Sequence, residues 1–418
     1  MQSLLVKFAA LYAATFIMMT GIGLQNTFLS LRLSMAGFPD QVTGMVLTFY
    51  FIGMAAGSFV CGRIIRLAGH IRAFTVFVAV ATAMTMLHGL YMSAAGWALF
   101  RFISGMAVLG LYMVVESWLN ECTSKEMRGR IFSFYMVTAY LGAVIGQSLL
   151  NFNSLENPSL FFMIGLLIVL SIVPVALTRS IHPQLPEVEQ RSLKELFKKT
   201  PVGMMGCFSS GLLAGAFYSM GPVYGLQLGL NTGELSMFMA VAIIGGLLMQ
   251  MPVGTVSDRF DRSKVLLILS LSTCLVSLLM IEVGRHAFPI LLTAAGIFGG
   301  VLFTIYPVAV ARAHDLFAPD EVVQVSTALF LSFSIGAVIG PTAVSVCMEI
   351  WGGYYGFPVY FFIISLFYSG ITIFLRKKEM VPVIPVEEQV PAKIMKSTSV
   401  IVMHMDPRAE SERREAQD

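Results

Sequence analysis

The sequence predicts an all-α polytopic membrane protein, with twelve transmembrane helices in two pseudo-symmetric six-helix bundles. The 418 residues are 56% hydrophobic and only 12% charged, whereas a soluble domain carries about 25% charged residues. Apolar runs long enough to cross a bilayer, about 20 residues each, follow one another along the chain. Several short patterns also recur after a nearly constant interval, which indicates that the chain contains the same half twice.

The apolar runs form two sets of six, separated by a polar stretch. The first set covers residues 4–31, 42–62, 74–93, 97–119, 131–150 and 160–177. The second set covers residues 202–228, 234–253, 265–283, 288–311, 323–348 and 357–375. We therefore expect an N-terminal bundle over 1–177, a linker over 178–201, a C-terminal bundle over 202–376 and a flexible polar tail over 377–418.

The basic residues lie on one side of the predicted membrane. All but Arg32, Arg101 and Arg285 of the 27 Lys and Arg residues lie at the start of the first span, follow an even-numbered span or belong to the tail. Because cytoplasmic loops are enriched in Lys and Arg, we expect both termini, the linker and the tail in the cytoplasm. An even number of spans agrees with this placement.

Several classes of function lack any support in the residues. The five cysteines have no paired spacing, so neither a disulfide framework nor a zinc site is expected. The spans contain no His, Asp or Glu cluster with metal-ligand spacing and no phosphate-binding P-loop. We therefore predict no metal, no cofactor, no enzymatic activity and no nucleic-acid partner.

The internal repeat can be placed in register. Gly62 and Gly254 open similar loops 192 residues apart, and the pentapeptide Gly-Ala-Val-Ile-Gly begins at Gly142 and again at Gly336, 194 residues later. One insertion of two residues reconciles both intervals. Two parallel six-helix halves joined by a cytoplasmic linker are typical of a secondary transporter.

The repeated pentapeptide also predicts close helix packing. Small residues spaced four apart let helix backbones approach each other within a bilayer. We therefore expect tight contacts at Gly142 and Gly146 in the fifth span, and at Gly336 and Gly340 in the eleventh.

The loop "GTVSDRFDRSK" (residues 254–264) resembles the loop signature of the major facilitator superfamily. Its first-half copy, "GRIIRLAGHIR" (residues 62–72), is more degenerate and has Arg66 in place of the aspartate. "RFISG" (residues 101–105) resembles that family's fourth-helix arginine motif, and "YMVVESWL…RGR" looks most like its YcaD-like bacterial branch. The resemblance implies a twelve-helix transporter in a bacterial inner membrane.

The resemblance further implies a cytoplasmic gate built from charged residues. In the C-terminal half the gate would comprise Asp258, Arg259 and Arg262. In the N-terminal half, Glu121 would act with Arg128 or Arg130. The alternative is that these charges only solvate loops and set topology.

Two ionisable residues lie clearly inside a span, both on the fourth. Insertion of such a residue costs about 2.5–3.5 kcal/mol, so Arg101 and Glu116 are functional candidates. Glu116 is interpreted as a proton carrier or as the partner of a loop arginine. Arg101 is interpreted as a ligand for an anionic substrate, as part of a proton relay, or as a structural arginine bound to carbonyl groups. Trp97 and Trp118 bracket this span, and we expect them to form an aromatic belt at the membrane interfaces.

The family's cavity-lining helices supply further polar candidates for the substrate and proton pathway. They are Gln25, Asn26, Tyr50, Tyr140, Gln147, Tyr218, Gln250 and Tyr306. Amides and tyrosines in an apolar cavity suit a mostly uncharged, amphipathic or mildly anionic solute. Each of them has plain hydrogen bonding between helices as its alternative role.

Together these features predict a secondary active transporter of a small organic solute that works by alternating access, is coupled to protons and is monomeric in the bilayer. Export is slightly favoured over uptake, because the glycine pair of the fifth span resembles an antiporter motif, although Gln147 replaces its proline. A proton-coupled uptake permease is the first alternative. A non-transporting membrane sensor or scaffold that uses the C-terminal tail is the alternative from another class.

Overall fold

The computed structural model describes residues 2–123, 125–177, 193–283, 288–317 and 322–376. Within these ranges, twelve helical spans are long and apolar enough to cross a membrane. The prediction of an all-α membrane protein with twelve transmembrane helices is therefore confirmed. Most helices extend past the apolar runs that predicted them, because their last turns carry polar residues at the membrane interface.

The helices of the first half precede the linker. They are α1 (Gln2–Met35), α2 (Asp40–Ala68), α3 (His70–Leu90), α4 (Ala94–Glu121), α5 (Lys125–Leu149), the short 3-10 helix η1 (Leu150–Phe152), α6 (Ser159–Leu170) and α7 (Ile172–Ala176). The helices of the second half are α8 (Leu193–Lys199), α9 (Pro201–Gln227), α10 (Thr232–Arg259), α11 (Arg262–Val283), α12 (Phe288–Leu302), α13 (Ile305–His314), α14 (Val322–Trp351) and α15 (Gly353–Arg376).

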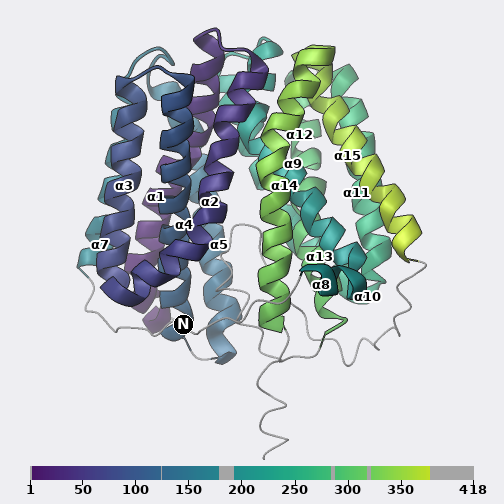
Figure 1. Cartoon of the computed structure of the whole chain (residues 1–418), viewed down its shortest axis with the longest axis horizontal. Helices are drawn as coiled ribbons and strands as arrows, with labels where there is room; N and C mark the ends of the chain where they lie inside the picture. The colour runs from purple at the N-terminus through teal and green to yellow at the C-terminus, as the bar shows by residue number, and fades with distance from the viewer. Residues whose placement is uncertain (1, 124, 178–192, 284–287, 318–321, 377–418) are drawn as a thin grey trace, which may run out of the picture.

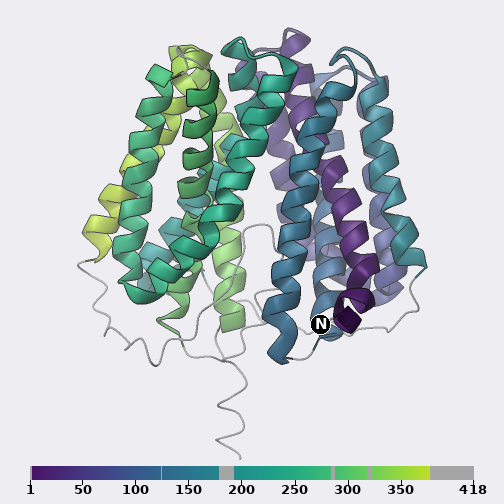
Figure 2. The same ribbon diagram turned by 180° about the vertical axis from the view of Figure 1, so that it is seen from behind.

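The two halves stand side by side as two groups of helices (Figures 1 and 2). The end of the molecule at which α1 begins lies at the bottom of both views, and we call it the N-terminal face. The other end is called the opposite face. The short helix α8 lies at the N-terminal face below the second half, where its Leu196 is buried.

Two of the twelve spans are broken into two helices, and a proline explains each break. Pro174 lies in α7 and Pro307 lies in α13, each at the third residue of its helix. A proline has no N–H to donate and its ring clashes with the carbonyl group four residues earlier. That carbonyl belongs to Leu170 at the end of α6 in one case, and to Phe303 just after α12 in the other.

The turns after the first and seventh spans have the same backbone geometry. Gly37 and Gly229 both have a positive φ, near 80°, which a glycine adopts without steric cost. In both turns the next residue donates its N–H to a carbonyl group five residues earlier, from Phe38 to Leu33 and from Leu230 to Gly225. This is the hydrogen bond of a Schellman helix end. The repeat seen in the sequence is therefore a repeat in backbone structure.

Glycines bring the paired helices of each half into backbone contact. A Cβ atom on Gly53 of α2 would clash with the carbonyl oxygen of Phe102 on α4, and one on Gly105 would clash with that of Tyr50. The second half repeats this crossing between α10 and α12, at Gly245 and Gly299.

A second type of crossing joins α1 to α5 and α9 to α14. Gly142 and Gly146 lie against the backbone of α1, and Gly336 and Gly340 lie against the backbone of α9. A bilayer provides no hydrophobic force between helices, so such close approach is what lets van der Waals contact hold them together.

The two halves contact each other through α2 and α14, α5 and α10, and α1 and α9. Near the opposite face, the hydroxyl groups of Thr48 and Thr342 lie 2.8 Å apart, and Gln227 donates to Asp40 over 2.9 Å. Asn151 also donates to the hydroxyl group of Ser236 there, over 3.3 Å. Among the described residues, no hydrogen bond joins the halves at the N-terminal face.

The glycine crossings make a direct prediction about stability. We expect Gly53→Ala to lower the melting temperature of the detergent-purified protein by several degrees, because overpacking of this kind costs about 1–3 kcal/mol. The matched control is Gly370→Ala in α15, where a Cβ atom meets nothing within 4 Å. The control should melt at or above the wild-type temperature, because alanine is about 1 kcal/mol better than glycine inside a helix. Equal melting temperatures for the two variants would contradict this reading of the α2–α4 contact.

Candidate functional site

A cavity of about 170 Å³ lies between the two halves. Helices α1, α2, α4 and α5 of the first half and α9, α10 and α14 of the second half line it. Four tyrosines contribute to its wall, namely Tyr50, Tyr112, Tyr140 and Tyr218. The other polar lining residues are Asn26, Thr27, Gln147 and Ser334, and the rest of the wall is apolar. No Asp, Glu, Lys or Arg is among the described residues that line it.

Arg101 lies directly behind this wall. Its side chain is only 3% exposed, and both of its Nη atoms donate to Oδ1 of Asn26 over 3.2 Å. The guanidinium carbon lies 4.1 Å from the centre of the Tyr50 ring, a distance at which a cation is attracted to an aromatic face. Asn26 and Tyr50 both line the cavity, so two lining residues stand between it and the arginine.

Other polar groups of the wall form bonds between helices. Gln147 accepts from the hydroxyl group of Thr27 over 2.7 Å and donates to the carbonyl group of Gly23 over 3.2 Å, which ties α5 to α1. Tyr140 accepts from Gln250 over 3.1 Å, which joins α5 to α10 of the other half. This second bond lies about halfway along both helices.

Five of the ten predicted pathway residues line the cavity: Asn26, Tyr50, Tyr140, Gln147 and Tyr218. The other five are not lining residues. Gln25 donates to Thr85 of α3 over 2.8 Å, and Gln250 reaches the cavity only through Tyr140. Tyr306 is buried with its ring 4.9 Å from that of Phe333. Arg101 and Glu116 lie behind the wall.

Glu116 is fully buried on α4, and Tyr135 of α5 donates to its carboxylate over 3.1 Å. Tyr112 precedes Glu116 by four residues, which places the two on one side of α4. Because Tyr112 lines the cavity, Glu116 lies one helical turn away from a lining residue. Tyr112 was not among the predicted site residues.

The expectation of an aromatic belt on α4 is wrong. Trp97 and Trp118 are both buried within the protein, and the Trp97 indole donates to the carbonyl oxygen of Tyr91 over 2.6 Å. A belt residue must face the membrane interface, whereas these two rings pack against His88 and His70.

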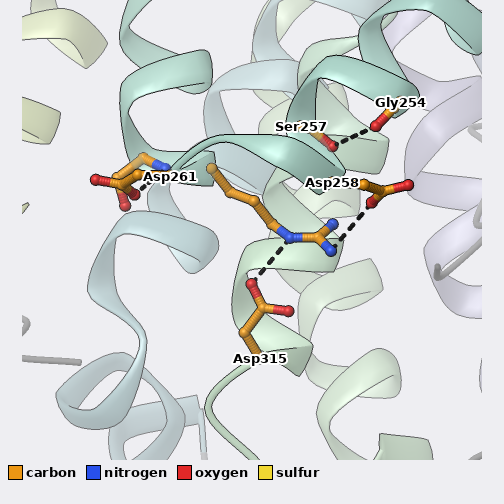
Figure 3. A network of polar contacts seen from close by, with 7 residues as sticks. Gly254, Ser257, Asp258, Asp261 and Asp315 are labelled. Atoms are coloured by element: carbon orange, nitrogen blue, oxygen red, sulfur yellow. Dashed lines mark hydrogen bonds and ion pairs between the residues drawn. The ribbon is translucent and has the colours of Figure 1, made fainter. Parts of the chain in front are cut away.

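Two of the three predicted gate residues of the second half, Asp258 and Arg262, belong to an ion-pair network at the N-terminal face (Figure 3). Arg262, at the start of α11, contacts Asp258 of α10 over 3.1 Å and Asp315 at the end of α13 over 2.9 Å. Arg262 is buried, so one guanidinium joins three helix ends away from bulk water. Arg259 is exposed and takes no part in these pairs.

Asp315 was missed by the sequence analysis, although the repeat could have identified it. It follows Glu121, a predicted gate residue of the first half, by the interval of 194 residues. The side chains of Glu121 and Arg128 lie outside the described residues, and Arg130 is exposed.

The first half differs at the position that corresponds to Arg262. His70 precedes Arg262 by 192 residues, is buried and shares a hydrogen bond of 2.8 Å with Ser117 of α4. A neutral or titratable imidazole thus stands where the second half has a permanent cation.

We expect Arg262→Gln to destabilise the protein by about 2 kcal/mol. Removal of one partner of a buried ion pair costs about 3–5 kcal/mol, and the partial exposure of Asp258 (35%) and Asp315 (19%) reduces that cost. Arg259→Gln, on the neighbouring exposed arginine, is the control and should change stability by less than about 0.5 kcal/mol. Thermal unfolding of both purified variants checks this, and an equal loss in both would show that Arg262 contributes nothing beyond surface charge.

Sequence comparison places this architecture in a known family. The family model described as Major Facilitator Superfamily matches residues 11–249 and 228–404. An uncharacterized MFS-type transporter of Yersinia pestis (strain Pestoides F) is 32% identical over 333 residues, which cover 78% of this chain and 85% of that relative. The uncharacterized MFS-type transporter YcaD of Escherichia fergusonii is 30% identical over 330 residues, with the same coverage.

Solved transporters share the fold at low sequence identity. The nucleoside transporter NupG matches with a TM-score of 0.71 at 13% identity, over 89% of this chain and 99% of that structure. A bacterial homolog to the human lysosomal transporter Spinster, in an inward-facing and unoccupied conformation, matches with a TM-score of 0.68 at 15% identity, over 91% and 99%. With this fold, and with relatives at about 30% identity over most of its length, the chain belongs to the Major Facilitator Superfamily and is an integral membrane transporter.

Proposed function

We propose that this protein is a proton-coupled secondary transporter that carries a small organic solute by alternating access. The observation that carries the proposal is the cavity between the two halves, combined with three hydrogen bonds that join the halves near the opposite face. A site enclosed between two rigid groups of helices can be exposed to each side in turn when the groups rock against each other.

The orientation of the protein follows from its charges. The adjoining ends of α2 and α3 carry Arg63, Arg66 and Arg72, and those of α10 and α11 carry Arg259, Arg262 and Lys264. These helix ends lie at the N-terminal face, which by the positive-inside rule is the cytoplasmic one. We therefore place both termini in the cytoplasm and the protein in a bacterial inner membrane. The state described here is then closed on the outside by α2 and α14.

Alternating access predicts distances that change in opposite directions at the two faces. Spin labels at Leu67 and Phe260 report on the N-terminal face, and labels at Leu90 and Ile350 report on the opposite face; all four side chains are more than 60% exposed. In proteoliposomes, we expect each pair to sample a short and a long distance, with the short population of one pair rising as that of the other falls. One fixed distance at both faces under every pH and solute condition would refute transport.

A cross-link supplies a control for that measurement that needs no knowledge of the substrate. Cysteines that replace Thr48 and Thr342, whose hydroxyl groups lie 2.8 Å apart, should form a disulfide in a background without the native cysteines. The locked protein should retain only the long distance at the N-terminal face. The two single-cysteine variants should keep both distances.

Glu116 is the proposed site of proton coupling. It is the buried carboxylate one turn from the cavity wall, and its hydrogen bond from Tyr135 links α4 to α5. Helix α5 in turn reaches the second half through Tyr140 and Gln250. Protonation of Glu116 would change the acceptor of the Tyr135 hydroxyl group and so bias the helix that contacts both halves.

We expect Glu116→Gln to abolish accumulation of solute driven by a pH gradient while exchange of solute across the membrane continues, because the isosteric amide cannot release a proton. The measurement uses proteoliposomes and a solute identified by thermal shift. The sign of the pH gradient that drives accumulation gives the direction of transport, and we favour export. Glu349→Gln, at an exposed position of α14, should behave as wild type. Full gradient-driven accumulation by Glu116→Gln would rule out this residue as the coupling group.

A further inference from the structure

The buried guanidinium of Arg101 has more donors than acceptors. It offers five N–H groups, yet both Nη atoms donate to the same oxygen, Oδ1 of Asn26, and Nε has no hydrogen-bond partner. No carboxylate among the described residues lies within ion-pair distance. A buried cation without a counter-anion is costly in a membrane protein, so this position favours an anion from outside the chain.

The charge of Arg101 is transmitted to the cavity through Asn26. An arginine is only a donor, so the amide oxygen of Asn26 must face it, and the amide nitrogen then faces away. Asn26 is partly exposed and lines the cavity, and its Nδ2 atom makes no hydrogen bond to the described residues. The cavity wall therefore includes the N–H₂ group of Asn26, which is polarised by the guanidinium of Arg101 bound to the other end of the same amide.

Tyr140, another residue of the cavity wall, has a donor to spare. The oxygen of Tyr140 already accepts from Gln250, so its own hydroxyl proton is directed elsewhere, and no acceptor for it lies among the described residues. Apart from Thr27, Gln147 and Ser334, the remaining wall is apolar and aromatic, with Phe51, Tyr218 and Phe333 among the lining residues. The cavity therefore combines donors near one positive charge with a hydrophobic body and contains no acidic side chain.

The volume limits the size of the solute. The cavity has a volume of about 170 Å³. Pockets for drug-sized ligands measure about 300–1,000 Å³.

One guanidinium balances one negative charge, and the like charge of Arg101 disfavours an organic cation in the same place.

We propose that the transported solute is a compact organic monocarboxylate. Its carboxylate accepts hydrogen bonds from the amide of Asn26 and is neutralised by Arg101, while its apolar part lies against the aromatic wall. This inference rests on the proposed function, because it takes the cavity to be the transport site.

Matched probes test the charge requirement. Benzoate and hexanoate are compared with benzamide and hexanamide, which have nearly the same shape but no charge, by thermal shift and calorimetry on the purified full chain. We expect the carboxylates to stabilise the wild type and the amides to bind at least about tenfold more weakly, as is typical when a charged hydrogen bond is lost. Arg101→Gln should lose this preference, and Arg101→Lys should keep part of it. Arg63→Gln, at an exposed position on α2, should leave it intact.

Asn26→Asp separates a binding role from a structural one. The new carboxylate would give Arg101 an internal counter-ion, so the variant should melt at a higher temperature than the wild type and yet lose carboxylate binding. A purely structural arginine predicts the gain in stability without the loss of binding, because no binding would depend on it.

The inference is overturned if the amides bind as tightly as the carboxylates, if no carboxylate binds, or if Asn26→Asp retains the binding. The proposed function fails on a different measurement, the absence of reciprocal distance changes at the two faces. Reciprocal changes without carboxylate binding would thus refute the substrate class and leave the transporter assignment in place.

Discussion

Backbone contact at the glycine crossings is the constraint on which the rest of the structure depends. Lipid tails are as apolar as leucine, so helices in a bilayer associate through close van der Waals packing. Gly53 and Gly105 hold α2 against α4, which sets the ring of Tyr50 over Arg101. Gly142 and Gly146 hold α1 against α5, which sets Gln147 against the backbone of α1. The polar centre of the first half is thus assembled by residues that have no side chains.

The duplicated halves keep this packing but divide the chemistry between them. At the intervals of the repeat, Arg101 corresponds to Ala295 and Glu116 corresponds to Val310, so both buried charges of the cavity region belong to the first half. The second half instead has the complete charged network at the N-terminal face, where Arg262 joins Asp258 to Asp315. A duplicated chain can specialise in this way because helix packing depends on small residues, whereas function depends on a few polar ones. The buried charges beside the cavity thus come from one half, and the described ion-pair network at the N-terminal face comes from the other.

How far the sequence predicts the site depends on how each helix is rotated. The spans can be predicted from the apolar runs, and the two halves from the repeat intervals. Neither prediction requires knowledge of how the helices pack. Gln25 and Asn26 are neighbours in sequence, but about 100° separates them around α1, and only Asn26 lines the cavity, while Gln25 bonds to α3. Because α1 is largely apolar on every side, no pattern in its sequence shows which side faces the cavity. The two tryptophans of α4 were misassigned for the same reason. Asp315, by contrast, was predictable from Glu121 and the interval of 194 residues.

The hydrogen bonds that join the two halves near the opposite face are weak enough for the binding energy of a small solute to offset them. Among the described residues, three polar bonds join the halves near the opposite face, at Thr48, Asp40 and Asn151, and a fourth joins Tyr140 to Gln250 halfway across. Neutral hydrogen bonds contribute about 0.5–1.5 kcal/mol each, and the bonds of Asp40 and Asn151 are partly open to water. The polar part of this contact is therefore worth a few kcal/mol, comparable with the roughly 5.5 kcal/mol that shifts a two-state equilibrium from 1:99 to 99:1. The bond between Tyr140 and Gln250 lies closest to the middle of the membrane, where rocking displaces the helices least. It can persist while the outer bonds break, and it ties the cavity wall to the motion of both halves.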